Sequence, residues 1–193
     1  KWYAVSADVY SFPIVRGNTL ETNGGNGLEI RAGKMDTPAS TPFEWGNTGV
    51  CYVLTGDVVI ANGVALTLKP GVVVKFVSWA GFFVEGALRA EGTAEQPVTF
   101  TSLKDDTAGG DTNGDGAASA PTSGDWRSIH FRDSSVDVTC LLDHCVIRYG
   151  GQYKQWGEMY SVGAVHLESA SPTIANCRIT DNKWYCLLYT SPS

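Results

Sequence analysis

The feature that most restricts the fold of this chain is a short pattern of residues that returns along it. LDHCVIRYG, which begins at Leu142, aligns with IANCRITDN, which begins at Ile174, at a lag of 174 − 142 = 32 residues. Both segments carry an apolar residue, a cysteine and an isoleucine at the same places. A third segment, VRGNTLETN from Val15, has asparagine where the others have cysteine. Such repeats indicate similar units stacked on one another.

Two further patterns recur. IHF at 129–131 aligns with VHL at 165–167 at a lag of 36, and LEI at 28–30 has the same in-out-in form. GVALTL and GALRA align with a lag of 88 − 66 = 22 between Leu66 and Leu88. Lags in the twenties, lengthened by loop insertions into the thirties, fit one turn of a strand solenoid. Successive turns would stack as parallel strands about 4.8 Å apart.

The runs between these patterns also indicate strands. Apolar residues alternate in short runs such as VVI, ALTL and VVVKF, which 22 glycines and 8 prolines interrupt. A β-sandwich also predicts many short strands, but it does not predict matched identities such as Cys145 over Cys177 or His130 over His166. The sequence therefore predicts an all-β strand solenoid.

Three segments carry a resemblance to a known family: VLTGDVVIANGVALTLKPGVVVKF, EGTAEQPVTFTS and SPTIANCRITDN. They resemble the secreted right-handed parallel β-helix repeat proteins of bacteria, which have a pectin-lyase-like fold, and the resemblance covers about residues 52–182. It implies a right-handed parallel β-helix, export to the cell surface or medium, and commonly a polysaccharide partner. It does not imply one activity, because that fold carries lyases, hydrolases and adhesins.

The same resemblance predicts how the chain is organised. Residues 1–31 are expected to be the end of a preceding β-helix module, and 32–48 a crossing segment. A second module is expected over 49–185, with loop insertions at 103–125 and 151–161. Adjoining domains of a longer chain are therefore expected partners.

The end of the sequence, CLLYTSPS at 186–193, resembles the translation of a transposase adapter used in sequencing libraries. We expect a non-native tail there, which would include Cys186. The alternative is a genuine next strand.

Composition excludes some classes of partner. The 14 Lys and Arg and 20 Asp and Glu give a net charge of −6, and no basic run occurs, which argues against a nucleic-acid partner. No apolar run is long enough to predict a membrane span. The 5 cysteines form no CxxC pair, so neither a zinc ribbon nor a redox dithiol motif is indicated.

A candidate metal site lies in the first predicted insertion. Asp111-Thr-Asn113-Gly-Asp115-Gly matches the D-x-[DN]-x-[DN]-G pattern, in which alternate oxygens converge on one cation and the glycine permits a sharp turn. Thr122 stands where an EF-hand has its bidentate glutamate, so the motif is no complete EF-hand. Another carboxylate would have to complete the shell. We predict a structural calcium site at Asp106, Asp111, Asn113 and Asp115, with Asp105 and Asp125 as further possible ligands; the alternative is a solvated acidic loop.

Three residues are weak catalytic candidates. His130 and His166 should stack on the outer face of neighbouring turns, where they could transfer protons in a polysaccharide groove, or could simply be surface polar residues. Arg148 follows from the resemblance, because an Arg or Lys base serves β-elimination in pectate-lyase-like enzymes; the alternative is an exposed strand end. No spacing of carboxylates selects an acid–base pair for glycoside hydrolysis.

Aromatic residues gather near the two predicted insertions, and they could either stack on sugar rings or cover an end of the core: Trp126, Tyr149, Tyr153 and Trp156. The leading hypothesis is an extracellular or cell-surface module that binds carbohydrate and holds structural calcium. The alternative is a polysaccharide lyase or glycoside hydrolase acting in a groove on the β-helix face. The strands carry too few threonines for the flat outward array that ice or mineral binding would need.

Overall fold

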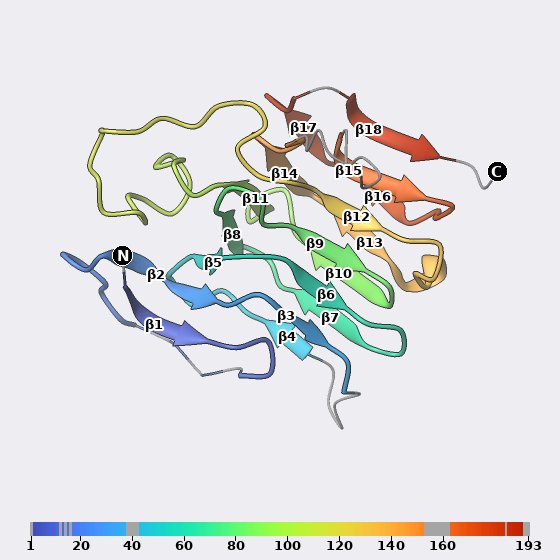
Figure 1. Ribbon diagram of the computed structural model, residues 1–193, viewed down its shortest axis with the longest axis horizontal. Helices are drawn as coiled ribbons and strands as arrows, with labels where there is room; N and C mark the ends of the chain where they lie inside the picture. Colours follow the sequence, from blue (N-terminus) through green and yellow to red (C-terminus); the bar gives the residue numbers. More distant parts are fainter. Residues whose placement is uncertain are drawn as a thin grey trace.

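The chain folds into strands that lie side by side along one axis. The computed structural model describes residues 2–11, 13, 15, 17–37, 43–152, 163–183 and 185–190, and of residues 185–190 it describes the backbone only. The strands run in order from β1, at one end of the stack, to β17 and β18 at the other (Figure 1). Among the described residues, the only helical element is a short 3-10 turn, η1 (Asp137–Thr139).

Three parallel sheets contain all the described strands. Sheet A comprises β1 (Tyr3–Ala7), β2 (Gly25–Ile30), β5 (Tyr52–Leu54), β8 (Val73–Phe76), β11 (Val98–Ser102), β14 (Cys145–Arg148) and β17 (Arg178–Thr180). Sheet B comprises β3 (Gly33–Met35), β6 (Val58–Ile60), β9 (Phe82–Val84), β12 (Ile129–Phe131), β15 (Gly163–Glu168) and β18 (Tyr185–Thr190). Sheet C comprises β4 (Phe43–Trp45), β7 (Ala65–Leu68), β10 (Ala87–Glu91), β13 (Leu141–Asp143) and β16 (Thr173–Ala175).

From β2 onward the chain visits sheets A, B and C in turn, so every third strand returns to the same sheet. This order is consistent with a β-solenoid. The prediction of an all-β chain with stacked parallel strands is confirmed.

The registers confirm three of the predicted alignments. Ile147 lies opposite Ile179 in sheet A, at the lag of 32. His130 lies opposite His166 in sheet B, and Leu66 lies opposite Leu88 in sheet C. Matched identities therefore located neighbouring strands correctly.

Two other alignments are wrong. The LEI segment at 28–30 belongs to β2 in sheet A, not beside β12 in sheet B. The segment from Val15 contributes no strand among its described residues, because β1 ends at Ala7 and β2 begins at Gly25. An in-out-in triplet occurs in any half-buried strand, so it does not identify a sheet.

The interior of the stack is lined by the apolar residues of all three sheets. Aromatic rings contact one another along it: Trp45 stacks on Tyr52 at 4.7 Å, and Phe76 stacks on Trp126 at 4.3 Å between ring centroids. Burial of each such side chain stabilises the fold by about 1.5–3 kcal/mol. Period-two alternation places these residues inward and leaves the intervening positions outward.

Corners of the stack repeat their backbone conformation from turn to turn. His144 and Asn176, at a lag of 32, have φ of 47° and 54°. Tyr149 and Asp181, at the same lag, have φ of 65° and 57°. Left-handed backbone is uncommon for residues other than glycine, so its recurrence shows that equivalent bends impose it in each turn.

The predicted boundaries fall within continuous sheets. β2 lies before residue 32 and pairs with β5, which lies after residue 48. The predicted crossing segment contains β3 and β4, which pair with β6 and β7. β18 begins at Tyr185 and pairs with β15, so most of it falls in the predicted tail. The open edge of a parallel sheet can pair with almost any extended segment. The pairing of β18 therefore does not distinguish a native strand from a non-native tail, and the non-native origin stays a prediction.

β11 ends at Ser102 and β12 begins at Ile129, and no residue between them lies in a strand. Of the second predicted insertion, 151–161, residues 153–161 lie outside the described part of the chain. Within the described part, no helix has the length and apolar character needed to cross a bilayer.

Candidate metal centre

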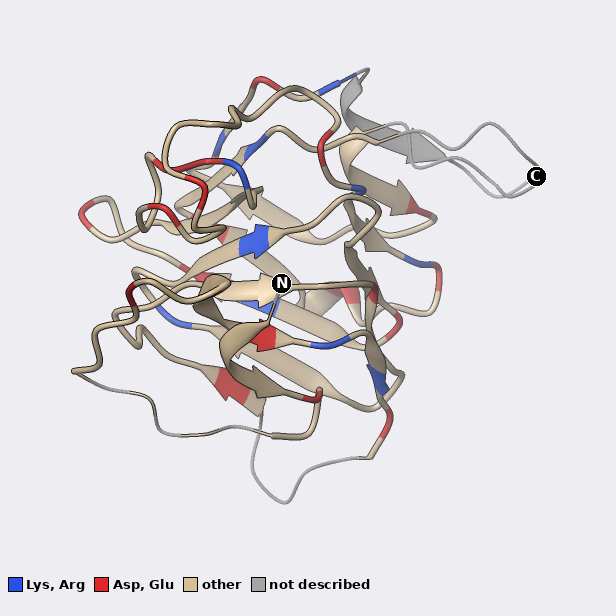
Figure 2. Ribbon diagram, turned by 60° about the vertical axis from the view of Figure 1, so that its left-hand side comes forward, with Lys and Arg blue, Asp and Glu red and all other residues tan. Residues whose placement is uncertain are grey.

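The long connection between β11 and β12, residues 103–128, is called the insertion below. In Figure 1 it is the yellow-green loop beside the sheet A strands β5, β8 and β11. Its acidic residues lie in several of its bends (Figure 2). The stretch at 110–112 lies on the outer face of sheet A.

Backbone contacts hold the insertion against sheet A. Lys75, which β8 points outward, is 0% exposed, and its Nζ donates to the Gly110 carbonyl at 2.7 Å. The Asn26 backbone N–H donates to the Thr112 carbonyl at 2.8 Å, and the Asn26 amide donates to the Asp111 carbonyl at 3.2 Å. A Cβ added at Gly109 would collide with Cys51 Sγ, so the loop is packed closely on the strand below.

Asp105 fastens the first end of the insertion. Its carboxylate is 0% exposed and accepts hydrogen bonds from the Thr101 and Thr107 hydroxyls. The Arg148 guanidinium lies 2.7 Å from the same group. Burial opposes ionisation of Asp105, but these hydrogen bonds and the Arg148 charge outweigh it and lower the pKa of Asp105.

Asp125 fastens the second end in a similar way. It accepts hydrogen bonds from the Ser102 hydroxyl at 2.8 Å and from the Thr122 backbone N–H at 3.0 Å. Lys104 Nζ lies 3.0 Å from the other carboxylate oxygen. Asp105 and Asp125, both possible metal ligands by sequence, thus have other partners in this structure.

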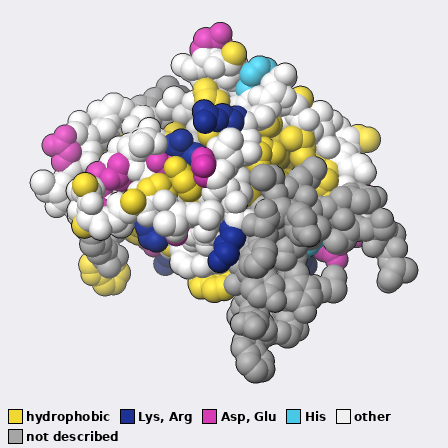
Figure 3. Space-filling model, turned by 90° about the horizontal axis from the view of Figure 1, so that it is seen from above, with side chains coloured by type: hydrophobic (Ala, Val, Ile, Leu, Met, Phe, Trp, Pro, Cys, Tyr) yellow, Lys and Arg dark blue, Asp and Glu magenta, His cyan; other side chains and the backbone are white. Residues whose placement is uncertain are grey.

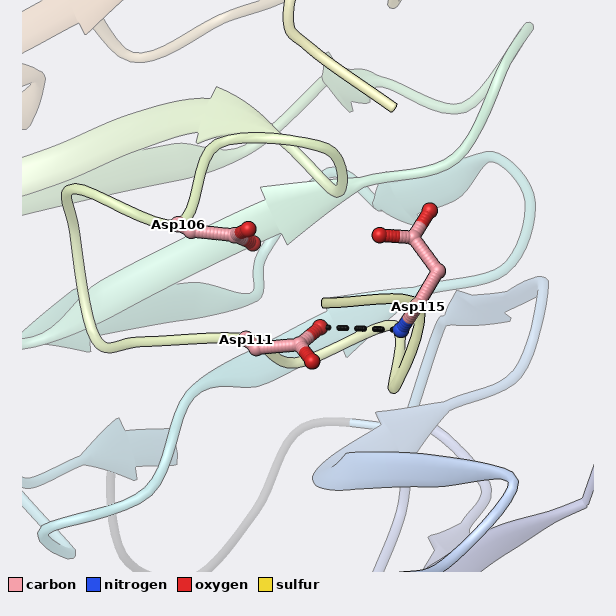
Figure 4. Close-up of side chains that lie close together, drawn as sticks. All are labelled: Asp106, Asp111 and Asp115. Carbon is pink, nitrogen blue, oxygen red and sulfur yellow. Dashed lines mark hydrogen bonds between the residues drawn. The ribbon is translucent and has the colours of Figure 1, made fainter. Parts of the chain in front are cut away.

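Between these ends, three carboxylates converge. Asp106, Asp111 and Asp115 each offer an oxygen, and the three oxygens lie within 4.8 Å of one another. Figure 4 shows the three side chains directed toward a common space. Ca²⁺–oxygen distances of about 2.3–2.6 Å allow ligands on opposite sides of one ion to lie about 4.8 Å apart. The spacing of the cluster therefore fits one calcium ion.

Asp111 is oriented by the backbone of the turn that follows it. Its two oxygens accept from the backbone N–H groups of Asp115 at 3.1 Å and Gly116 at 2.8 Å. These bonds, above all the one from Gly116, lower the pKa of Asp111. Gly116 has φ of 67°, which is the left-handed bend that the sixth position of the motif requires.

The other two carboxylates each carry an oxygen that lacks a donor. Oδ1 of Asp106 and Oδ1 of Asp115 are buried and have no hydrogen-bond partner. Burial raises the pKa of Asp106, and the nearby charge of Asp111 raises it further. Buried, unpaired carboxylate oxygens are costly, and a cation in the shared space would satisfy both.

The structure thus brings together three of the four predicted ligands. The fourth, Asn113, directs its amide nitrogen toward Asp115 Oδ2 at 2.9 Å and Ser119 Oγ at 3.1 Å. Asn113 therefore supports the position of Asp115 through a hydrogen bond. Lys75 was not among the sequence candidates, although its place in the apolar run VVVKF was a signal that something covers that strand.

The histidine pair has the predicted register but a different environment. The His130 and His166 rings stack at 4.1 Å, with 17° between their planes. They are 6% and 4% exposed, so they are buried rather than arrayed on a surface. His130 Nε2 lies 3.0 Å from Glu168 Oε2. The alternation of inward and outward residues along the strands predicted that these rings point outward. It could not predict whether other groups cover the rings.

Burial also limits the chemistry of this pair. Burial and the charges of His166, Arg132 and Arg127 lower the pKa of His130 to about 3. Burial lowers the pKa of His166 as well, against the opposing charge of Glu168. His130 is therefore neutral at pH 7, and a group with such a low pKa is a weak general base.

Of the predicted carbohydrate contacts, Trp126 lies in the core. It is 0% exposed, it stacks on Phe76 inside the stack, and its Nε1 donates to the Arg148 carbonyl at 2.8 Å. The insertion re-enters the core at this residue, which is why an aromatic stands there. Tyr149 is half-buried, and the Arg148 guanidinium lies over its ring, 5.6 Å from the ring centroid. Tyr153 and Trp156 lie outside the described residues.

Arg148, the third catalytic candidate, has a structural contact instead. Its side chain binds Asp105 and donates to Thr107 Oγ1 at 2.7 Å. It therefore ties β14 to the first end of the insertion.

The surface shows no concentration of positive charge among the described residues. On the face seen in Figure 3, Lys and Arg lie among Asp and Glu. Cross-strand pairs such as Arg127–Asp57 at 2.8 Å and Lys34–Glu85 at 3.1 Å account for part of this mixing. The expectation that nucleic acid is not a partner stays a prediction.

No protein-family model, curated protein or solved structure matches this chain.

Proposed function

We propose that this protein is an extracellular or cell-surface module with a right-handed parallel β-helix fold, that its insertion holds a structural calcium ion, and that its outer surface binds carbohydrate. The observation that carries the calcium proposal is the convergence of Asp106, Asp111 and Asp115, two of which have a buried oxygen without a donor. A right-handed path is the hand that parallel crossover connections almost always take.

The chemistry of the cluster favours calcium over softer metals. All its ligand atoms are carboxylate oxygens, which are hard ligands, and the turn after Asp111 matches the spacing of calcium loops. Three carboxylates supply a charge that one divalent cation largely balances. Backbone carbonyls and water would complete a shell of six to eight oxygens.

A structural role fits the position of the cluster. The two ends of the insertion are fastened by Asp105 and Asp125, and the carbonyls of Gly110, Asp111 and Thr112 are held from below by Lys75 and Asn26. The bend from Asp106 to Asp115 lies between these anchors. A cation there would hold the carboxylate side of this bend, whose backbone carbonyls at 110–112 are already held by Lys75 and Asn26.

Export is supported by two considerations. The segments at 53–76, 91–102 and 171–182 resemble those of secreted β-helix proteins. Calcium sites of modest affinity are filled at the millimolar calcium concentrations found outside cells. Both considerations support the proposal of a module at a cell surface or in the medium.

The carbohydrate partner has narrower support. Of the four predicted aromatic contacts, Tyr149 is the described one that is not fully buried, so its ring is the candidate to stack on a sugar. The enzymatic alternative is not proposed, because the low pKa of His130 makes it a poor base and His166 is buried beside it.

Calorimetric calcium titration tests the metal proposal. We compare the wild type with Asp111→Asn/Asp115→Asn, and with Asp133→Asn/Asp181→Asn, which removes the same charge from two exposed positions. Wild type and control should bind one Ca²⁺ and gain thermal stability from it, whereas the double variant at the cluster should do neither. At a hundredfold excess over Kd the gain is about 2.7 kcal/mol. Equal calcium responses in all three proteins would refute the site.

The carbohydrate proposal needs a separate measurement. Co-sedimentation with uronate-containing polysaccharides should retain the wild type, and Tyr149→Asn should reduce that retention. Asparagine tolerates the left-handed φ of 65° at this position, so the variant keeps the bend. Equal retention of the two proteins, or none of either, would contradict the proposed contact.

A further inference from the structure

Cys145 and Cys177 meet between two successive turns of the stack. The pairing of Val146 with Arg178 places the two cysteines opposite one another, at the start of β14 and just before β17. The Cys145 backbone N–H donates to Cys177 Sγ at 3.4 Å, and Cys177 Sγ also lies 3.3 Å from the Leu142 carbonyl of the same neighbouring turn. Both cysteines are free, and the Cys177 sulfur lies against the backbone of Cys145.

The two thiols differ in access and acidity. Cys145 is 1% exposed, whereas Cys177 is half-buried. Proximity to Cys145 lowers the pKa of Cys177, whereas proximity to Cys177 and burial raise the pKa of Cys145. Because Cys177 is the thiol that solvent reaches, an external disulfide meets it first, and Cys145 is the buried partner beside it.

We propose that Cys145 and Cys177 are a thiol–disulfide exchange site, at which a small-molecule disulfide oxidises the pair to a cystine that joins two turns. Neighbouring parallel strands lie about 4.8 Å apart, which is within the Cα separation of about 4.4–6.8 Å that a disulfide spans. The bond would close a loop around one turn of the solenoid, residues 146–176.

The reaction takes two exchange steps. The Cys177 thiolate attacks one sulfur of the external disulfide, whose S–S bond breaks and releases one thiolate. That thiolate takes the proton from Cys145, which then attacks Cys177 Sγ and displaces the second thiol from the mixed disulfide. Two protein thiols are oxidised, and one external disulfide is reduced to two thiols.

The other described cysteines lack this arrangement. Cys51 Sγ contacts the Gly109 carbonyl at 3.6 Å, and Cys140 Sγ contacts the Gly86 carbonyl at 3.7 Å. Both are buried, and burial raises the pKa of each thiol. They serve as internal controls in the same molecule.

The test is exchange with oxidised glutathione, followed by proteolysis and mass spectrometry of the cysteine peptides. All proteins carry Cys186→Ser, so that the thiol at 186 does not contribute. With both cysteines present, the peptides of 145 and 177 should become linked, and no glutathione should remain bound. Cys145→Ala should keep one glutathione on Cys177. Cys177→Ala should react at Cys145 at least tenfold more slowly.

Circular dichroism shows whether each variant folds, and unfolding the parent in guanidinium should remove the selectivity among its thiols. The proposal is overturned if glutathione remains on Cys177 while Cys145 is present, if the two single variants react at equal rates, or if neither residue reacts before Cys51 and Cys140.

Discussion

Two outward strips of the stacked sheets, one on sheet A and one on sheet B, are both buried, and they differ in how their polar side chains are accommodated. On sheet A, Lys75 lies beneath the insertion in a region that also contains Asp105 and the three clustered carboxylates. On sheet B, His130 and His166 lie buried as stacked rings. On sheet A several carboxylates oppose the effect of burial on Lys75. On sheet B the Glu168 carboxylate lies 3.0 Å from His130, but burial and the neighbouring positive charges outweigh it.

The pKa of Lys75 shows the balance on sheet A. Burial lowers it, while Cys51 and the carboxylates of Asp105, Asp106 and Asp111 oppose that change. On sheet B the guanidinium groups of Arg127 and Arg132 add to burial and disfavour the imidazolium form of His130. The same alternation produced both strips, so the difference comes from what surrounds them.

Removing the buried anion from sheet A should have the largest effect. Asp105→Asn leaves Arg148 without its carboxylate and weakens two hydroxyl contacts, so the free energy of unfolding should fall by about 3 kcal/mol. Urea denaturation measures this loss. Asp133→Asn, at an exposed position, should change stability little. If the two variants lose the same amount, the network on sheet A is not what holds the insertion.

The second largest effect should be a loss of stability in acid that comes from the histidine strip on sheet B. The pKa of His130 is about 3 in the folded protein and about 6.5 in the unfolded chain, so the unfolded chain binds more protons between these values. Stability should therefore fall as pH drops below about 6.5. His130→Gln/His166→Gln should remove about 2 kcal/mol of the loss between pH 7 and pH 4.5.

Urea denaturation at a series of pH values gives this difference. His144→Gln is the matched control, because that histidine lies at a corner with its side chain about 32% exposed. An acid dependence of the double variant identical to that of the wild type would show that the buried pair does not carry it.

Lys75→Met should move two quantities in opposite directions. Loss of the hydrogen bond to Gly110 should lower the thermal stability of the metal-free protein. Loss of a positive charge near the cluster should raise calcium affinity about tenfold, or about 1.4 kcal/mol. Calorimetry with Lys69→Met, which removes a lysine paired with Glu44 and Glu91, provides the comparison. Weaker calcium binding by Lys75→Met would mean that the lysine supports the site rather than competing with it.

The smallest effect is expected beside the histidine strip. Two guanidinium groups lie over the Phe83 ring: that of Arg127 is 5.4 Å from the ring centroid and that of Arg132 is 5.1 Å from it. Phe83→Leu keeps an apolar side chain but removes both cation–π contacts, and should lower the free energy of unfolding by about 1 kcal/mol. Arg89→Gln removes an arginine charge on sheet C, away from Phe83. It tests whether the loss of any surface arginine contact lowers the free energy of unfolding by the same amount.

The sequence predicted neighbouring turns wherever residue identity repeated. Cys145 and Cys177, and His130 and His166, located strand pairs in two different sheets. The alignment of LEI at 28–30 with IHF at 129–131 was wrong, because alternation alone does not assign a strand to a sheet. Residue identity in the repeat carries three-dimensional information that periodicity lacks.

The candidate site was predicted less completely. The motif identified Asp111 and Asp115, but three nearby carboxylates were available to join them. The structure brings in Asp106, because adjacent residues point in different directions and Asp105 faces Arg148, 43 residues further along. Likewise, no local pattern shows that Trp126 enters the core at the end of the insertion, since that depends on Phe76 in another turn.

The recurring left-handed corners have a consequence for how such a chain can change in length. His144 and Asn176 give the backbone the same bend immediately before Cys145 and Cys177. The chain thus leaves both corners in the same direction, one strand spacing apart. Deleting residues 145–176 would join two ends that already have matching conformation, and duplicating them would add a turn in the same way. In this part of the molecule, gain or loss of a whole turn should leave the backbone conformation at the junction unchanged. Gain or loss of a single residue should shift the strand that follows out of register.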